Sequence, residues 1–215
     1  MLYVFCFQLF LSPMPSQNLY PDFLNKTLSE VRQEFGWVVI AEATGNLDRD
    51  SQEDFAIVLE SKEVLRETRC DGCEEQESRG RIILVLVGGT VIAQNNVFIA
   101  RADEGGMTRD IKPSLAITNR QLDIFYMLVR GEDHYIFEMK GNDIVLVKAS
   151  KLRASHYLFR SDVVDFKKRE LVTANQTAAD KPAERKTTRL KHSGKLVKLS
   201  ELKMMGIWNV GGVFL

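Results

Sequence analysis

The feature that most constrains this chain is a series of short apolar runs separated by turn residues. Between residues 114 and 150, Gly131 and the Gly141-Asn142 pair separate the runs SLAITN, QLDIFYMLVR, HYIFEMK and DIVLVKAS. Glycine and asparagine accept the positive φ angles of tight turns, so runs broken in this way are typical of antiparallel hairpins. The pattern predicts an antiparallel meander, which two further strands around Lys167-Lys168 continue.

Near the start of the chain the apolar spacing changes to that of a helix. Leu24, Leu28, Val31 and Phe35 recur every three or four residues, which predicts an amphipathic helix between Pro21 and Phe35. The fold class that follows is α+β and mainly antiparallel β, with this N-terminal helix packed on a meandering antiparallel sheet.

The segment between the helix and the meander contains further strands. RIILVLVGG is a continuous apolar run that predicts a central strand, and TVIAQ and NVFIAR predict two short strands joined through Asn95 and Asn96. Residues 61–80 are charged, so we expect a surface loop there, with a short helical turn at KEVLRE.

The beginning of the chain resembles an export signal. An apolar run from Leu2 to Leu11 is followed by Pro13 and Pro15, although no Lys or Arg precedes the run. Export to a bacterial periplasm or to the cell surface is the favoured interpretation. In the competing interpretation, the run is a core strand of the mature fold.

Three regions follow from this division of the chain. Residues 1–19 are predicted to be a signal-like leader, residues 20–205 a single globular antiparallel β domain, and residues 206–215 an apolar C-terminal tail. A chain of 215 residues is of a suitable length for one such domain.

Charge is distributed unevenly although the chain is neutral overall. Residues 148–205 carry fifteen Lys and Arg against six Asp and Glu, whereas residues 1–147 carry fourteen against twenty-three. We expect the basic strands to lie against the acidic half. Nucleic-acid binding is not expected, because few aromatic residues interleave with the basic ones. No apolar run is long enough to span a bilayer.

The cysteines leave two interpretations open. Cys70 and Cys73 lie in CDGC, an acidic glycine-containing setting that predicts either a local disulfide or two free thiols. Structural zinc is not expected, because His134, His156 and His192 show no paired metal-ligand spacing.

The segment GNLDRDSQEDFAIVLE, residues 45–60, places oxygen-bearing side chains at alternate positions before an apolar strand. These residues are Asn46, Asp48, Asp50, Gln52 and Asp54. Calcium prefers six to eight oxygen ligands, which a tight loop can supply from every second residue. In the alternative interpretation, the segment is a metal-free turn whose side chains bond to nearby backbone amides.

This segment resembles the D-x-[DN]-x-D-G-x-x-D calcium loop of FG-GAP, or integrin-type, repeats. The resemblance implies side-chain oxygens from Asn46, Asp48, Asp50 and Asp54 and a carbonyl from Gln52. The sequence departs from the family pattern at two positions, because Asn46 replaces a charged first ligand and Ser51 replaces a glycine.

The order of motifs over residues 20–150 is also similar to that of bacterial exported proteins with a single FG-GAP-like loop. The matching segments, in order, are GNLDRDSQEDFAIVL, RIILVLV, NNVFIARADEGG and HYIFEMKGNDIVLVKAS. The resemblance implies a small antiparallel β or α+β domain without catalytic activity, and it implies no substrate.

The loop RADEGGMTRD is the second candidate functional surface. Its charged residues Arg101, Asp103, Glu104 and Arg109 are predicted to contact a protein partner. We therefore expect an exported, non-catalytic binding module, for example an inhibitor or an immunity-type protein. The alternative is an envelope hydrolase that uses Asp103 and Glu104 with His134; no GxSxG, phosphate-loop or HExxH motif supports it.

Overall fold

The computed structural model describes most of the chain. The described residues are 19–69, 72–101, 103–104, 110–155, 158–177, 183–190, 195–203, 209–210 and 213–214. Residues 1–18 of the predicted leader lie outside them. The predicted tail contributes two short strands, β12 (Asn209–Val210) and β13 (Val213–Phe214), which pair with each other.

The smaller of the two main sheets has four antiparallel strands in chain order. They are β1 (Trp37–Gly45), β2 (Asp54–Glu67), β3 (Gln76–Val87) and β4 (Thr90–Asn95). The surface loop predicted for residues 61–80 is wrong over most of its length, because β2 and β3 continue into it. A bulge between Glu60 and Val64 interrupts the ladder, and the residues of β2 beyond it are exposed or half-buried.

The larger sheet is an antiparallel meander of seven strands in chain order. They are β5 (Ser114–Thr118), β6 (Gln121–Leu128), β7 (Gly131–Lys140), β8 (Asp143–Ala154), β9 (Phe159–Asp165), β10 (Glu170–Gln176) and β11 (Glu184–Arg189). The mainly antiparallel β fold and the meander predicted from the sequence are therefore confirmed.

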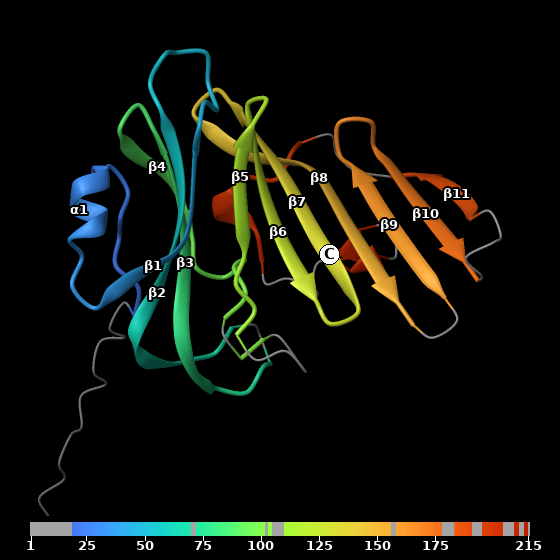
Figure 1. Cartoon of the computed structure of the whole chain (residues 1–215), viewed down its shortest axis with the longest axis horizontal. Coiled ribbons are helices and arrows are strands. Elements are labelled where there is room, and N and C mark those ends of the chain that lie inside the picture. Colours follow the sequence, from blue (N-terminus) through green and yellow to red (C-terminus); the bar gives the residue numbers. More distant parts are fainter. Residues whose placement is uncertain are drawn as a thin grey trace, which may run out of the picture.

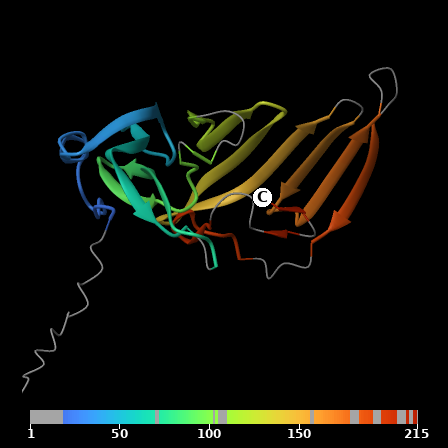
Figure 2. The ribbon, with the colours of Figure 1, turned by 90° about the horizontal axis from the view of Figure 1, so that it is seen from below.

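The two sheets form layers that overlap only in part. Figures 1 and 2 show the small sheet lying beside β5 and β6, while β9, β10 and β11 extend away from it. Apolar side chains from both sheets form one core cluster, which includes Val58 and Ile83 of the small sheet and Ile124 and Phe137 of the large one.

The central strand β3 is buried on both faces, which explains its uninterrupted apolar run. Ile83 and Val85 belong to the core shared with the large sheet, whereas Ile82 and Leu84 belong to a second cluster with Phe23. Alternate residues of a strand point to opposite faces, so a stretch of strand covered on both sides has an almost continuous apolar sequence.

The predicted N-terminal amphipathic helix over residues 21–35 is wrong. Only the short helix α1 (Leu28–Arg32) forms, and it starts at a capping box in which Thr27 and Glu30 bond to each other's backbone N–H. Of the residues at helical spacing, Val31 is buried but Phe35 is 93% exposed.

Backbone pairing with the edge of β4 explains why the helix is so short. The Asn25 N–H donates to the Val91 carbonyl at 2.9 Å, and the Val91 N–H donates to the Lys26 carbonyl at 2.9 Å. Asn25 has a φ of 65°, which a right-handed helix does not accept. The apolar residue that this arrangement buries is Phe23, which stands outside the helical pattern.

A C-terminal segment, residues 195–203, joins the two layers and contains the 3₁₀ turn η1 (Leu199–Glu201). The Asn95 amide at the end of β4 donates to the Leu199 carbonyl at 2.7 Å and to the Leu202 carbonyl at 3.0 Å. On the large sheet, the Leu146 N–H donates to the Val197 carbonyl at 2.9 Å. This segment therefore closes one end of the shared core.

The glycines at the two turns that flank β7 give a test of the meander. A Cβ added to Gly131 would lie 1.9 Å from the Leu152 carbonyl oxygen, whereas a Cβ on Gly141 would meet nothing within 4 Å. Both glycines have positive φ. Gly141→Ala should therefore cost about 1–2 kcal/mol for the left-handed backbone, and Gly131→Ala about 1–3 kcal/mol more for the overpacking. Urea unfolding of both variants measures the difference, and equal losses would contradict the observed register of β7 and β8.

Candidate functional site

The acidic loop joins β1 and β2, which are neighbouring antiparallel strands paired from Gly45 and Asp54 onward. Its backbone is held by its own side chains. The Asp48 carboxylate accepts from the Asp50 N–H, and the Asp50 carboxylate accepts from the Gln52 N–H, both at 2.8 Å. The Asn46 amide nitrogen donates to the carbonyl oxygens of Asp50 and Gln52.

Asp54 lies at the base of this loop and is buried. One of its carboxylate oxygens, Oδ2, accepts from the Leu47 N–H at 2.6 Å, while Oδ1 has no hydrogen-bond partner among the described residues. Burial raises the pKa of this carboxyl, and the charge of Asp48 raises it further. Across the described residues, no three His, Cys, Asp or Glu side chains are grouped closely enough to hold a metal ion.

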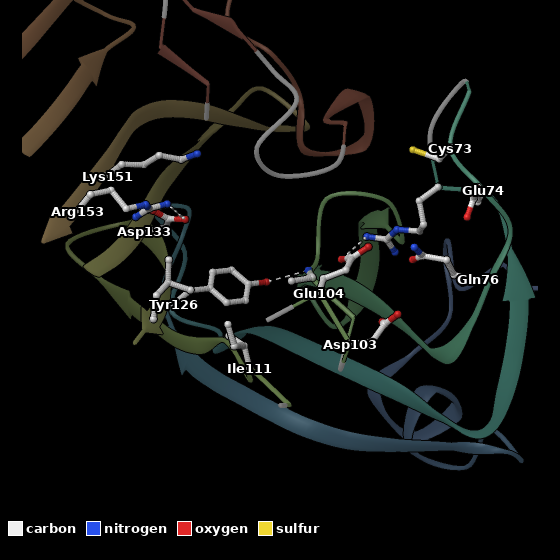
Figure 3. Close-up of a pocket in the computed structure, with 13 residues that line it drawn as sticks. Cys73, Glu74, Gln76, Asp103, Glu104, Ile111, Tyr126, Asp133, Lys151 and Arg153 are labelled. Carbon is white, nitrogen blue, oxygen red and sulfur yellow. Dashed lines mark hydrogen bonds and ion pairs between the residues drawn. The ribbon is translucent and has the colours of Figure 1, made fainter. Parts of the chain in front are cut away.

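A cavity of about 480 Å³ opens between the two sheets, far from the acidic loop. One side is formed by β8 and β7, with Lys151, Arg153 and Asp133. Figure 3 shows these three side chains on one side and Glu74, two residues before β3, on the opposite side. Apolar side chains, among them those of Ile111, Tyr126 and Leu128, also line the cavity.

Ala100, Asp103, Glu104 and Ile111, which follow β4, form another wall of the cavity, and residues 96–101 are not a strand. The strand predicted for NVFIAR is therefore wrong. In place of a neighbouring strand, the Arg69 guanidinium donates to the carbonyls of Asn96 at 2.8 Å, Val97 at 2.7 Å and Ile99 at 2.9 Å. The Arg69 side chain is only 4% exposed. The Arg69 guanidinium thus gives these carbonyls the hydrogen bonds that the N–H groups of a neighbouring strand would otherwise provide.

Arg81, in the middle of β3, also donates hydrogen bonds to the segment that follows β4. Its guanidinium donates twice to Glu60 Oε2, at 2.8 and 2.6 Å, and its Nη1 donates to the Ala100 carbonyl at 3.1 Å and to the Ile111 carbonyl. Arg81 is fully buried, and the Glu60 side chain is 7% exposed.

Arg101 completes this set, which we call the arginine network: Arg69, Arg81 and Arg101. Arg101 is fully buried and donates to Glu67 at 3.2 Å, to Gln76 at 2.9 Å and to Asp103 at 3.1 Å. Through Glu60, Glu67 and Gln76, the network fixes this wall of the cavity to strands β2 and β3.

Three of the four residues predicted to bind a partner lie in or beside this cavity. Asp103 and Glu104 line the cavity. Arg101 donates to both carboxylates, to Asp103 from its guanidinium and to Glu104 from its backbone N–H. The Asp103 side chain is 39% exposed and that of Glu104 is 19% exposed. Arg109 lies outside the described residues.

His134, the base of the alternative hydrolase, is not brought to the cavity. It occupies the face of β7 opposite to Asp133, because neighbouring residues of a strand point to opposite faces. There its ring lies 4.4 Å from that of Phe125, and its Nδ1 lies 3.5 Å from Asp123 Oδ1. Asp103 and Glu104 therefore have no histidine beside them among the described residues that line the cavity.

Sequence reasoning missed the polar wall contributed by β7 and β8. Arg153 donates to both oxygens of Asp133, at 2.6 and 3.0 Å. Burial lowers the pKa of the neighbouring Lys151 ammonium. One signal was present: Ala149 is a core residue, and the period of two places Lys151 and Arg153 on its side of the sheet.

Cys73 also lines the cavity and forms a disulfide bond, so it is not a free thiol. The second cysteine of this bond lies outside the described residues, as does Cys70 of the predicted local pair. In the part of the chain that the structure describes, no helix is long and apolar enough to cross a membrane. No protein-family model, curated protein or solved structure matches the chain.

The arginine network predicts that two arginines beside the same carboxylate, Arg81 and Arg79, contribute very differently to the free energy of unfolding. Arg81→Met leaves the buried Glu60 charge without its main partner, so we expect a loss of about 3–5 kcal/mol in the free energy of unfolding. Arg79 lies two residues away on β3, is 56% exposed and approaches Glu60 only to 3.6 Å. Arg79→Met should therefore cost at most about 1 kcal/mol.

Chemical denaturation of both variants provides the measurement. Replacing Glu60 by Gln in the Arg81→Met background should recover part of the loss, since the uncompensated charge is then removed. Similar losses for Arg79→Met and Arg81→Met would contradict the importance assigned to the buried pair.

Proposed function

We propose that this protein is a non-catalytic binding module that receives a segment of a protein partner in the cavity between its sheets. The observation that carries the proposal is the rigid wall beside the cavity, where the arginine network holds Asp103 and Glu104 in place. Sites that bind ligands are commonly concave and preformed, with volumes of roughly 300–1,000 Å³. A wall fixed before binding also lowers the entropy lost on association.

The described lining of the cavity favours recognition over catalysis. It contains no serine, threonine or histidine, and its cysteine is held in a disulfide. Lys151 and Arg153 lie on one side of the cavity and Glu74 on the other, an arrangement that selects partners by charge complementarity. The hydrolase alternative has less support, because it needs His134 beside Asp103 and Glu104.

The setting we propose is the bacterial envelope, where an inhibitor or immunity-type protein would meet its target. The disulfide at Cys73 supports an oxidising compartment, since such bonds persist in the periplasm and outside the cell and are rare in the cytosol.

A second proposal concerns calcium at the acidic loop. Two features support it: the buried Oδ1 of Asp54 lacks a partner, and the carbonyls of Asp50 and Gln52 converge on one point, where they accept from the Asn46 amide nitrogen. A cation at this point would draw the Asn46 oxygen inward instead. Asn46, Asp48, Asp50 and Asp54 would then supply side-chain oxygens and Gln52 its carbonyl, a donor set of the hard-oxygen kind that calcium takes.

The cavity is tested with two neighbouring substitutions on β6. Leu128→Trp places a large ring in the cavity, whereas Met127→Trp lies on the opposite face, at a position that is 69% exposed. Immobilised protein is incubated with an envelope extract of the producing bacterium, and retained proteins are quantified by mass spectrometry. We expect a partner that wild type and Met127→Trp retain equally and that Leu128→Trp retains at least tenfold less. Equal retention by the two variants would remove the cavity from the binding site.

The calcium proposal is tested by thermal melting during a calcium titration. Binding to the native state alone raises the unfolding free energy by about 2.7 kcal/mol at a hundredfold excess over Kd. Asp50→Ala should abolish the rise in Tm, whereas Glu53→Ala, an exposed position in the same loop between the alternating ones, should preserve it. A wild-type Tm that does not change with calcium would end the proposal.

A further inference from the structure

A row of polar side chains crosses the inner face of the large sheet where the cavity opens. Asp133 on β7 stands opposite Lys151 on β8, Lys151 stands opposite Asp162 on β9, and Asp162 stands opposite Thr173 on β10. Directly opposite residues of an antiparallel pair share one face of the sheet. All four side chains therefore lie on the face that also carries the core.

The next pair along β8 and β9 brings two arginines together. Arg153 stands directly opposite Arg160, an arrangement of like charges that costs stability. Each guanidinium is offset by a carboxylate of the neighbouring row. Arg153 bonds to both oxygens of Asp133, at 2.6 and 3.0 Å, and Arg160 bonds to both oxygens of Asp162, at 2.8 and 3.2 Å.

Lys151 lies between Asp133 and Asp162, whose charges favour its ammonium form, but both carboxylates are already bonded to other side chains. Thr173 donates to Asp162 Oδ1 at 2.7 Å, so Asp162 receives bonds from Thr173 and Arg160, and Asp133 receives its bonds from Arg153. No hydrogen bond or ion pair joins Lys151 to another residue in the described part of the chain, although its ammonium is partly withdrawn from water. The cluster contains three cations and two carboxylates, so it carries a surplus of one positive charge.

We infer that Lys151 and Arg153 form an anion site that takes a carboxylate of the partner segment, an inference that rests on the proposed function. The site lies at one end of the cavity, and Figure 3 shows Lys151 extending from β8 across from Cys73 and Glu74. A carboxylate at Lys151 supplies the missing charge and gains from the low polarity of the adjoining core. At the far end, Glu74 is exposed and suits a basic group of the same segment.

Peptide carboxylates come from two sources, a side chain and a chain terminus, and small probes distinguish them. N-acetyl-glutamate amide carries the side-chain carboxylate, and N-acetyl-glycyl-glycine carries the terminal one. N-acetyl-glutamine amide and N-acetyl-glycyl-glycine amide are the uncharged controls. Each is titrated into the purified full chain labelled with ¹³C at the lysine Cε, without any partner present.

We expect at least one carboxylate probe to shift the Lys151 signal in a saturable manner and the amide probes to leave it unchanged. A bound anion favours the ammonium, so the pKa of Lys151 should rise in the complex. Both Lys151 variants lack this signal, so their binding is followed by the shifts of backbone amides in heteronuclear spectra; Lys151→Met should weaken the binding at least tenfold, and Lys151→Arg should retain it. Lys148, an exposed lysine three residues away on the opposite face of β8, is the control, and Lys148→Met should bind as wild type does.

Three results would overturn the inference: no saturable shift with either carboxylate, equal shifts with the amides, or undiminished binding by Lys151→Met. Heteronuclear spectra verify that each variant is folded. If no carboxylate probe binds but Leu128→Trp still reduces partner capture, the protein remains a binding module and the carboxylate is ruled out as the group it recognises. A positive titration without any captured partner would instead remove the proposed function and keep the anion site.

Discussion

The buried pair of Arg81 and Glu60 is the interaction on which the rest of the structure depends. The segment that follows β4 crosses the interior without a neighbouring strand, so its carbonyl groups need donors that water does not supply. Arg81 and Arg69 provide these donors, and a guanidinium suits the task because it carries five N–H groups in a rigid plane and stays charged. Glu60 lowers the free-energy cost of burying Arg81, because its carboxylate offsets the positive charge within hydrogen-bonding distance. Without this arrangement the wall of the cavity would have no fixed position.

The cavity lies where the apolar core ends. The core gives way to charged residues within two positions along each strand. Tyr135, Ala149 and Val164 form one cross-strand row of the core. Two residues further along the same strands, a step of about 7 Å, the equivalent positions are Asp133, Lys151 and Asp162. Charged groups therefore lie directly beside low-polarity material, where water screens them less than at an open surface. At this position a small number of charges dominates the electrostatic potential of the cavity.

The sequence predicted the regular part of this molecule and missed the irregular part for physical reasons. The meander follows from alternation and turn residues, which are local signals, and the unbroken run of RIILVLV indicated a strand that is covered on both sides. The helix was wrong because the spacing of Leu24, Leu28, Val31 and Phe35 carries no information about the edge of β4, which pairs with Asn25 and Lys26 instead. NVFIAR is as apolar as a strand, but the donor for three of its carbonyls is Arg69, 27 residues before Asn96. Asp103 and Glu104 were identified because charged loop residues stand out, whereas Lys151 and Arg153 lie inside a strand and only its period reveals their direction.

The two candidate ligands would act at opposite ends of the sheets, and this separation limits how they can influence each other. Residues of the acidic loop lie beside Asn119, Arg120 and Gly141, at the end of β6 where Gln121 lies. The carboxylate site lies at the other end of β6, near Leu128, about 24 Å away at 3.4 Å per residue. No charge effect of the metal would survive that distance in physiological salt, where screening acts over about 8 Å. Calcium would therefore stabilise the β1–β2 hairpin and, through it, the population of folded protein, without tuning the affinity of the cavity. Coupling between the two sites would require β2, which carries Asp54 at one end and Glu67 at the other, to shift as a unit.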